Sequence, residues 1–360
     1  MKALCVLAVA LFAAMTARPA CAADPIKIGV IYPLTGNAAS AGSSAKDAVE
    51  LGADIVNTAH PGLQGLPLAA TAGLPNLGGA KIELINVDHQ GNPQVGQNQT
   101  LRLITQDKVV AMLGAYHSSV ALVATAVAER QGIPFLVGDS VALNITGRGF
   151  KWIFRTGPFA SDFANAYSTD VSGQVLQLKQ LKPDAVIFIS YTADTILYFK
   201  TLKNLDYLPP IIIGDDAGFS DPAFIPNVGD IAQGAINRSA WDVGQPGGNT
   251  YKINEMFKAK FGRDLDDTSA RWMQGFLVLA DAINRAGSTE PAKIQAALRE
   301  TDLKPEQLMI GYRGVKFDDT GQNTLSATYL IQLQGKAYKS VWPENRATAK
   351  LEWPMAGWRK

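Results

Sequence analysis

The stretch Leu113-Gly114-Ala115-Tyr116-His117-Ser118-Ser119 decides how this chain folds. Before it, Lys108–Leu113 is a short apolar run with β-branched residues, which is typical of a buried strand. After it, Val120–Gln131 places its apolar residues at helical spacing, with Ser118 or Ser119 as the expected N-cap. The stretch therefore predicts a strand, a glycine turn and a helix, which together form the repeating unit of a parallel α/β sheet.

The same turn is the first candidate ligand site. Tyr116, Ser118 and Ser119 lie where the C-terminal end of a strand meets the positive end of a helix. Hydroxyls and free backbone N–H groups at such a position bind a small anion or carboxylate. An ordinary βα turn with a good cap would have a similar sequence, so this segment alone leaves both interpretations open.

Strands and helices alternate along the rest of the chain, which predicts two doubly wound α/β lobes around a ligand cleft. We expect the second lobe to be reduced in size. The expected divisions are a signal peptide at 1–22, a first lobe at 23–155, a shortened second lobe at 156–239, helices returning toward the first lobe at 240–286, and a crossover and C-terminal segment on the second lobe at 287–360.

The N-terminus predicts export. Lys2 precedes the apolar run Ala3–Met15, and Ala20-Cys21-Ala22 fits the rule for cleavage by signal peptidase. The run is shorter than the ~20 residues that span a bilayer, which favours a cleaved signal over an anchor. Lipid attachment at Cys21 is the alternative. Cleavage after Ala22 removes both cysteines, so we expect a periplasmic chain without disulfides.

Charge and motifs exclude several classes of function. With 33 basic and 32 acidic residues the formal net charge is +1, which predicts no binding to nucleic acid. The sequence contains no phosphate-binding loop, dinucleotide fingerprint, nucleophile elbow or zinc-protease motif. His60, His89 and His117 lack metal-ligand spacing, and His89 is expected to be a solvated loop residue. We therefore expect no metal, no cofactor and no enzymatic activity.

Two positions in the second half are further candidates for the cleft. Tyr191 follows the strand Ala185–Ser190, so its ring should face the cleft, although packing alone would also explain a tyrosine there. Asp215 and Asp216 follow the strand Pro210–Gly214. A single carboxylate at a strand end can hold an ammonium group, while a metal pair, an acid/base pair and a capping turn are the alternatives.

Several runs resemble the leucine/isoleucine/valine-type periplasmic binding proteins of ABC importers, which have a type I two-lobe fold. The runs are Ile28–Gly36, Asp88–Pro93, Ala115–Ser119, Arg148–Thr156 and Asp216–Phe224. The resemblance implies that a monomer captures an amino-acid-like ligand by hinge closure and delivers it to an inner-membrane ABC permease. It implies that Ser118, together with Ser140 and Val141, holds the ligand carboxylate. Asp216 would hold the ammonium group, and Tyr191 would be the cleft tyrosine.

One join departs from the family pattern. Ser161–Tyr167 and the segment that starts at Ser168 both favour a helix, and no strand lies between them. Members of the family carry a strand, a helix and another strand at this place. We therefore expect an internal deletion that leaves apolar surface exposed on Val171–Leu181. The alternative functions are a same-fold binder of an amide, urea or aromatic carboxylate, and an extracytoplasmic ligand sensor.

Overall fold

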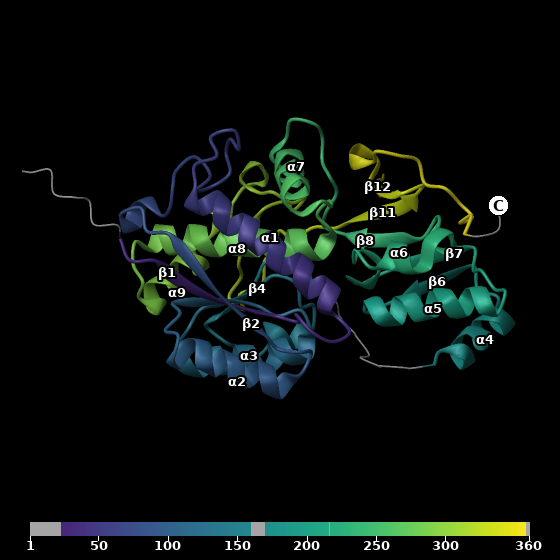
Figure 1. The fold of residues 1–360 in the computed structure, drawn as a ribbon, viewed down its shortest axis with the longest axis horizontal. Coiled ribbons are helices and arrows are strands. Elements are labelled where there is room, and N and C mark those ends of the chain that lie inside the picture. The colour runs from purple at the N-terminus through teal and green to yellow at the C-terminus, as the bar shows by residue number, and fades with distance from the viewer. Residues whose placement is uncertain (1–22, 160–169, 216, 358–360) are drawn as a thin grey trace, which may run out of the picture.

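The computed structural model describes residues 23–159, 170–215 and 217–357, which form two α/β lobes side by side (Figure 1). The first lobe contains a parallel sheet of order β2-β1-β3-β4-β5. Its strands are β1 (Ile26–Tyr32), β2 (Ile82–Asp88), β3 (Ala111–Gly114), β4 (Phe135–Val137) and β5 (Ile153–Arg155).

Helices cover both faces of the first sheet. Along β1, Val30 packs into the core formed with α1 (Ala39–Asn57) and α8 (Asp267–Ala286). The next residue, Ile31, packs into the other core, formed with α2 (Pro93–Thr105) and α3 (Ser118–Gln131). Side chains alternate between the faces of a strand, so the continuous apolar run of β1 serves both cores. The doubly wound first lobe expected from the sequence is confirmed.

The close contact of α1 with α8 depends on a glycine. A Cβ atom added to Gly52 of α1 would lie 2.8 Å from a ring carbon of Phe276 on α8. The absent side chain therefore lets the two helices approach each other and bury the centre of the first lobe. Helical spacing of apolar residues in the sequence predicts a helix over Ala45–Asn57, but α1 begins earlier, at Ala39.

The second lobe has a mixed sheet of order β12-β11-β8-β7-β6. Its strands β6 (Ala185–Phe188), β7 (Ile211–Gly214) and β8 (Ile236–Ser239) are parallel, and β11 (Tyr329–Gln334) and β12 (Ala337–Trp342) run antiparallel to their neighbours. One face packs against α4 (Ser172–Leu181), α5 (Thr192–Asn204) and α6 (Phe224–Val228), with Phe199 and Phe224 at the centre of this core.

Apolar surface remains exposed at the end of the second sheet. Leu176 and Leu181 of α4 are 47% and 77% exposed, and Ile187 on the edge strand β6 is 62% exposed. Exposed apolar surface on this helix agrees with the expectation for a shortened lobe. The join between Tyr167 and Ser168 lies outside the described residues, so the internal deletion stays a prediction.

Further elements lie outside the two five-stranded sheets. They are α7 (Asn249–Phe261), α9 (Pro291–Arg299) and the strand pair β9 (Asp302–Leu303) and β10 (Val315–Lys316). The sequence placed 287–360 on the second lobe, but Ile294 and Leu298 of α9 are buried in the first core. After α9, the chain returns to the second sheet at β11. Within the described ranges, no helix combines the length and apolar character needed to cross a membrane.

Candidate functional site

The turn between β3 and α3 offers free donors. Ser118 is the first residue of α3, and His117, whose side chain makes no capping hydrogen bond, occupies the N-cap position. The N–H groups of Val120 and Ala121 already donate to the carbonyl oxygen of His117. In the described part of the chain the N–H groups of Ser118 and Ser119 have no acceptor, as is usual for the first turn of a helix.

The Ser118 hydroxyl serves a different purpose from the expected one. It does not cap α3; instead, its Oγ accepts a hydrogen bond of 3.3 Å from the N–H of Ala142 in the loop after β4. The predicted capping role of Ser118 or Ser119 is therefore wrong, because the extended backbone of His117 starts the helix one residue earlier. Ser118 is 7% exposed and Ser119 is half-buried, so both lie at the edge of the interior.

The loop after β4 is fixed by its own hydrogen bonds. The buried Ser140 hydroxyl donates to the carbonyl of Ala115 and lies 3.1 Å from the carbonyl oxygen of Tyr116, and Val141 is also buried. Arg155, at the end of β5, is completely buried and donates to the carbonyl of Ala142 at 2.7 Å. Burial lowers the pKa of Arg155 to about 10, so its guanidinium remains charged at neutral pH and fixes the loop relative to β5.

Aromatic side chains of both lobes meet beside this turn. Tyr191 occupies the N-cap position of α5 in the second lobe and is half-buried. Its ring centroid lies 5.3 Å from that of Tyr116 and 5.2 Å from that of His117, both in the first lobe. The structure therefore brings the three rings together across the boundary between the lobes, next to Ser118.

A buried histidine pair lies behind these rings. His89 was expected to be a solvated loop residue, but it is completely buried, so that prediction is wrong. Its ring centroid lies 5.4 Å from that of His117, and its Nδ1 accepts a hydrogen bond of 3.0 Å from the N–H of Gly91. Both residues follow strands whose C-terminal ends share one edge of the sheet, a signal that the sequence does contain.

Burial keeps the imidazole rings of His89 and His117 neutral. It lowers the pKa of His89 to about 3, with a further contribution from the charge of His117, and it lowers the pKa of His117 to about 4. Neutral imidazoles have one donor and one acceptor nitrogen each, so this part of the site is polar but uncharged at pH 7.

Of the two aspartates that follow β7, the structure describes only Asp215. Asp215 forms an ion pair with Arg238 of the neighbouring strand β8, so its carboxylate is engaged within the second lobe. Asp216, the candidate partner for an ammonium group, lies outside the described residues. Within the described ranges no group of three or more His, Cys, Asp or Glu side chains is arranged to hold a metal ion.

Two α/β lobes with polar turns and aromatic rings facing one another at strand ends define a two-lobe ligand-binding protein. A family model described as "Periplasmic binding protein" matches residues 25–167 and 159–337. The chain belongs to this family of solute-binding proteins.

Individual relatives cover nearly the whole chain. Leu/Ile/Val-binding protein homolog 8 of Brucella suis biovar 1 is 28% identical over 405 residues, covering 93% of this chain and 94% of the relative. Leu/Ile/Val-binding protein homolog 7 of Brucella abortus is 26% identical and covers 95% and 98%, respectively.

Solved structures show the same fold. LivJ of Streptococcus pneumoniae, solved in complex with isoleucine, is 18% identical with a TM-score of 0.75 and covers 89% of this chain and 100% of its own. A solute-binding protein of Rhodopseudomonas palustris, solved with 3,4-dihydroxybenzoic acid, is 18% identical with a TM-score of 0.72 and covers 93% and 99%. The two structures carry different ligands, so the fold alone does not define the ligand.

Proposed function

We propose that this protein captures an amino acid, branched-chain or similar, in the periplasm and delivers it to an inner-membrane ABC permease. Residues 1–22 would direct export as a cleaved signal peptide, and the exported protein would act as a monomer. The observation that carries the proposal is the meeting of Tyr191 with Tyr116 and His117 beside the free N–H groups of Ser118 and Ser119.

The ligand carboxylate would bind at the start of α3. Two unbonded N–H groups, the Ser118 hydroxyl and the positive end of the helix dipole converge there. Ser140 and Arg155 would act through the loop after β4, because their hydrogen bonds fix its position relative to Ser118. Asp216 would hold the ammonium group from the second lobe, and the Tyr116 and Tyr191 rings would contact the side chain.

Binding would couple to lobe closure. A ligand that contacts Ser118 in one lobe and Asp216 in the other gains its full set of contacts only when the lobes approach each other. The ligand therefore shifts the population toward the closed arrangement in proportion to that difference in contacts. A permease could then distinguish the loaded protein by the relative position of its two lobes.

An aromatic carboxylate is the second candidate ligand. It is favoured by the clustered rings of Tyr116, His117 and Tyr191, on which an aromatic ligand could stack. Calorimetry with L-isoleucine, L-leucine, L-phenylalanine, 4-hydroxybenzoate and 3,4-dihydroxybenzoate distinguishes the two. Binding of the benzoates without any amino acid would contradict the amino-acid proposal.

Ser118→Ala should weaken amino-acid binding by about 1–3 kcal/mol, because it leaves one carboxylate oxygen without its hydroxyl donor. The N–H groups of the α3 first turn remain in this variant, so binding should be reduced but not abolished. Titration calorimetry of the wild type and the variant measures the difference. Unchanged affinity would remove the Ser118 hydroxyl from the proposed site.

Asp216→Asn should weaken amino-acid binding by about 2 kcal/mol, roughly 30-fold, because it removes the charge that pairs with the ammonium group. Asp230→Asn is the matched control, since Asp230 is an exposed carboxylate of the same lobe. An equal effect of both substitutions would indicate a general loss of negative charge. Full affinity in Asp216→Asn would overturn the assignment of the ammonium partner.

A further inference from the structure

A second pocket lies on the other side of the connections between the lobes. It has a volume of about 310 Å³, at the lower end of the range typical of small-molecule pockets. In Figure 1 the elements beside it, α7 and β12, lie on the upper side of the molecule, whereas α2, α3 and α5 lie below them. The pocket is thus separate from the candidate site at Ser118.

Both lobes contribute walls to this pocket. Leu308 and Ile310 come from the segment that packs in the first core, and Tyr329 is the first residue of β11 in the second sheet. Arg346 comes from the segment after β12, and its Nη1 donates to the carbonyl of Gly311 at 3.0 Å. This hydrogen bond connects the end of the second lobe to the first.

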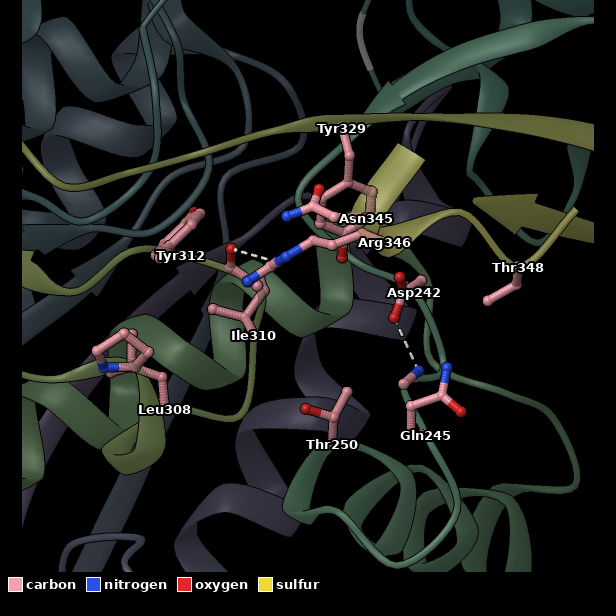
Figure 2. A pocket seen from close by; sticks show the side chains of 13 residues that line it. Asp242, Gln245, Thr250, Leu308, Ile310, Tyr312, Tyr329, Asn345, Arg346 and Thr348 are labelled. Atoms are coloured by element: carbon pink, nitrogen blue, oxygen red, sulfur yellow. Dashed lines mark hydrogen bonds between the residues drawn. The ribbon is translucent and has the colours of Figure 1, made fainter. Parts of the chain in front are cut away.

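Two opposite charges enter the pocket from different segments (Figure 2). The Asp242 carboxylate accepts a hydrogen bond of 2.8 Å from the N–H of Gly244, and the Arg346 guanidinium donates to the carbonyl of Gly311. Among the described residues these two side chains are not joined in an ion pair, and neither pairs with another charged group. Each therefore keeps hydrogen-bonding capacity for a ligand.

The pocket also has an apolar wall. Leu308, Ile310 and Tyr312 are buried side chains that line it, and Tyr329, only 3% exposed, lies next to Arg346. Burial raises the pKa of Asp242, although the hydrogen bond from Gly244 and the charge of Arg346 oppose this. The Asp242 carboxylate is thus poorly solvated, and a cationic partner would stabilise it.

We propose that this pocket is a second ligand site, which binds a small zwitterion with an apolar body. The ligand's carboxylate would pair with Arg346, its ammonium group with Asp242, and its apolar part with Leu308 and Ile310. Because the walls belong to both lobes, occupancy of the pocket is linked to the angle between them, and binding at either site would alter affinity at the other.

Titration with L-leucine tests this proposal on the intact protein. Calorimetry, together with NMR of the amide signals of Gly244 and Gly311, should show a binding phase assigned to the pocket. Arg346→Met and Asp242→Asn should each weaken that phase at least tenfold, since each removes one charge partner. Arg313→Met is the matched control, because Arg313 is an exposed arginine that does not line the pocket.

Two analogues of leucine, each carrying a single charge, test whether the pocket requires both charged groups of the ligand. 4-Methylpentanoate lacks the ammonium group of leucine and 3-methylbutylamine lacks the carboxylate, so each should bind the pocket at least tenfold more weakly than leucine. Ser118→Ala should weaken the phase that belongs to the candidate site between the lobes directly, and should change the pocket phase only through the coupling between the two sites. Absence of the candidate-site phase in the unmodified protein, with the pocket phase present, would count against the proposed function and leave the second site intact.

The proposal is overturned if the Gly244 and Gly311 signals do not respond to leucine. It is also overturned if Arg313→Met reduces the second phase as much as Arg346→Met does, because the effect would then reflect net charge. Equal binding of leucine and its two single-charge analogues would contradict the zwitterion as the ligand class.

Discussion

Replacing Arg271 with methionine should destabilise the protein by about 3–5 kcal/mol, because it leaves two buried carboxylates without their counter-charge. Arg271 of α8 is 1% exposed. Its Nε lies 3.1 Å from Asp267, and its guanidinium also pairs with Asp139 in the loop after β4. Chemical denaturation of the ligand-free protein measures the change.

The ion pairs of Arg271 with Asp267 and Asp139 form a buried network that also reaches the segment between the lobes. Asp267 also accepts hydrogen bonds from the N–H of Ala240, at 2.7 Å, and from the Ser239 hydroxyl, at 3.1 Å. Ser239 ends β8, and Ala240 begins the return to the first lobe, so the network fixes a connection between the lobes. Loss of Arg271 should therefore weaken both the first core and its junction with the second lobe.

A surface ion pair provides the control. Lys46 and Glu50 are four residues apart on α1, and their side chains are about one-third exposed, at 33% and 34%. Lys46→Met should cost less than about 0.5 kcal/mol, since such helix-surface pairs contribute little. A cost below about 1 kcal/mol for Arg271→Met would mean that the two aspartates are relieved by protonation or solvent, contrary to this account.

Lowering the pH from 7 to 5 should destabilise the ligand-free protein by about 4 kcal/mol through His89 and His117 together. Their pKa values in the folded protein are about 3 and about 4, below the 6.5 of an unperturbed histidine. At pH 5 the unfolded chain therefore binds nearly two protons that the folded chain does not bind. The contribution of these two histidines to the free energy of unfolding is complete above pH 6.5 and falls as the pH decreases toward their pKa values in the folded protein.

Single substitutions separate the two contributions. His117→Gln should remove about 2 kcal/mol of this pH dependence, because one of the two titrating rings is absent. His60→Gln is the control, since His60 lies in the loop after α1, where its Nε2 lies 2.9 Å from the Thr58 hydroxyl. Denaturation curves at pH 7 and 5 provide the comparison. An unchanged pH dependence in His117→Gln would show that His117 is accessible to protons in the folded state.

Local sequence signals predicted the elements of the fold with small errors. The sequence predicts a helix at Tyr251–Phe261, and the observed helix begins at Asn249. It also predicts a strand at Thr328–Leu333, and the observed strand is β11, Tyr329–Gln334. These predictions succeed because helical and strand periodicity depend on neighbours in the sequence. The first lobe followed from the same signals, since its strands and helices alternate from β1 to β4.

Local signals did not predict where the last third of the chain packs. The sequence predicts that 287–360 is a crossover and C-terminal segment on the second lobe, yet α9 buries Ile294 and Leu298 in the first core beside α8. An amphipathic helix reveals which face it buries but not against which partner. The surface on which α9 packs is formed by α8. Helix α8 itself packs against α1, which lies more than 200 residues away in the sequence.

The amino-acid sequence alone specified the alternation of strands and helices, and hence the C-terminal strand ends at which Ser118 and Ser140 lie in the first sheet and Tyr191 lies in the second. Only the tertiary structure decided the surroundings of those residues. The burial of His89 against His117, and the hold of Arg155 on the loop after β4, depend on segments that meet only in the folded chain. Periodicity is encoded locally, whereas burial, charge pairing and pKa depend on three-dimensional neighbours, which no local pattern records.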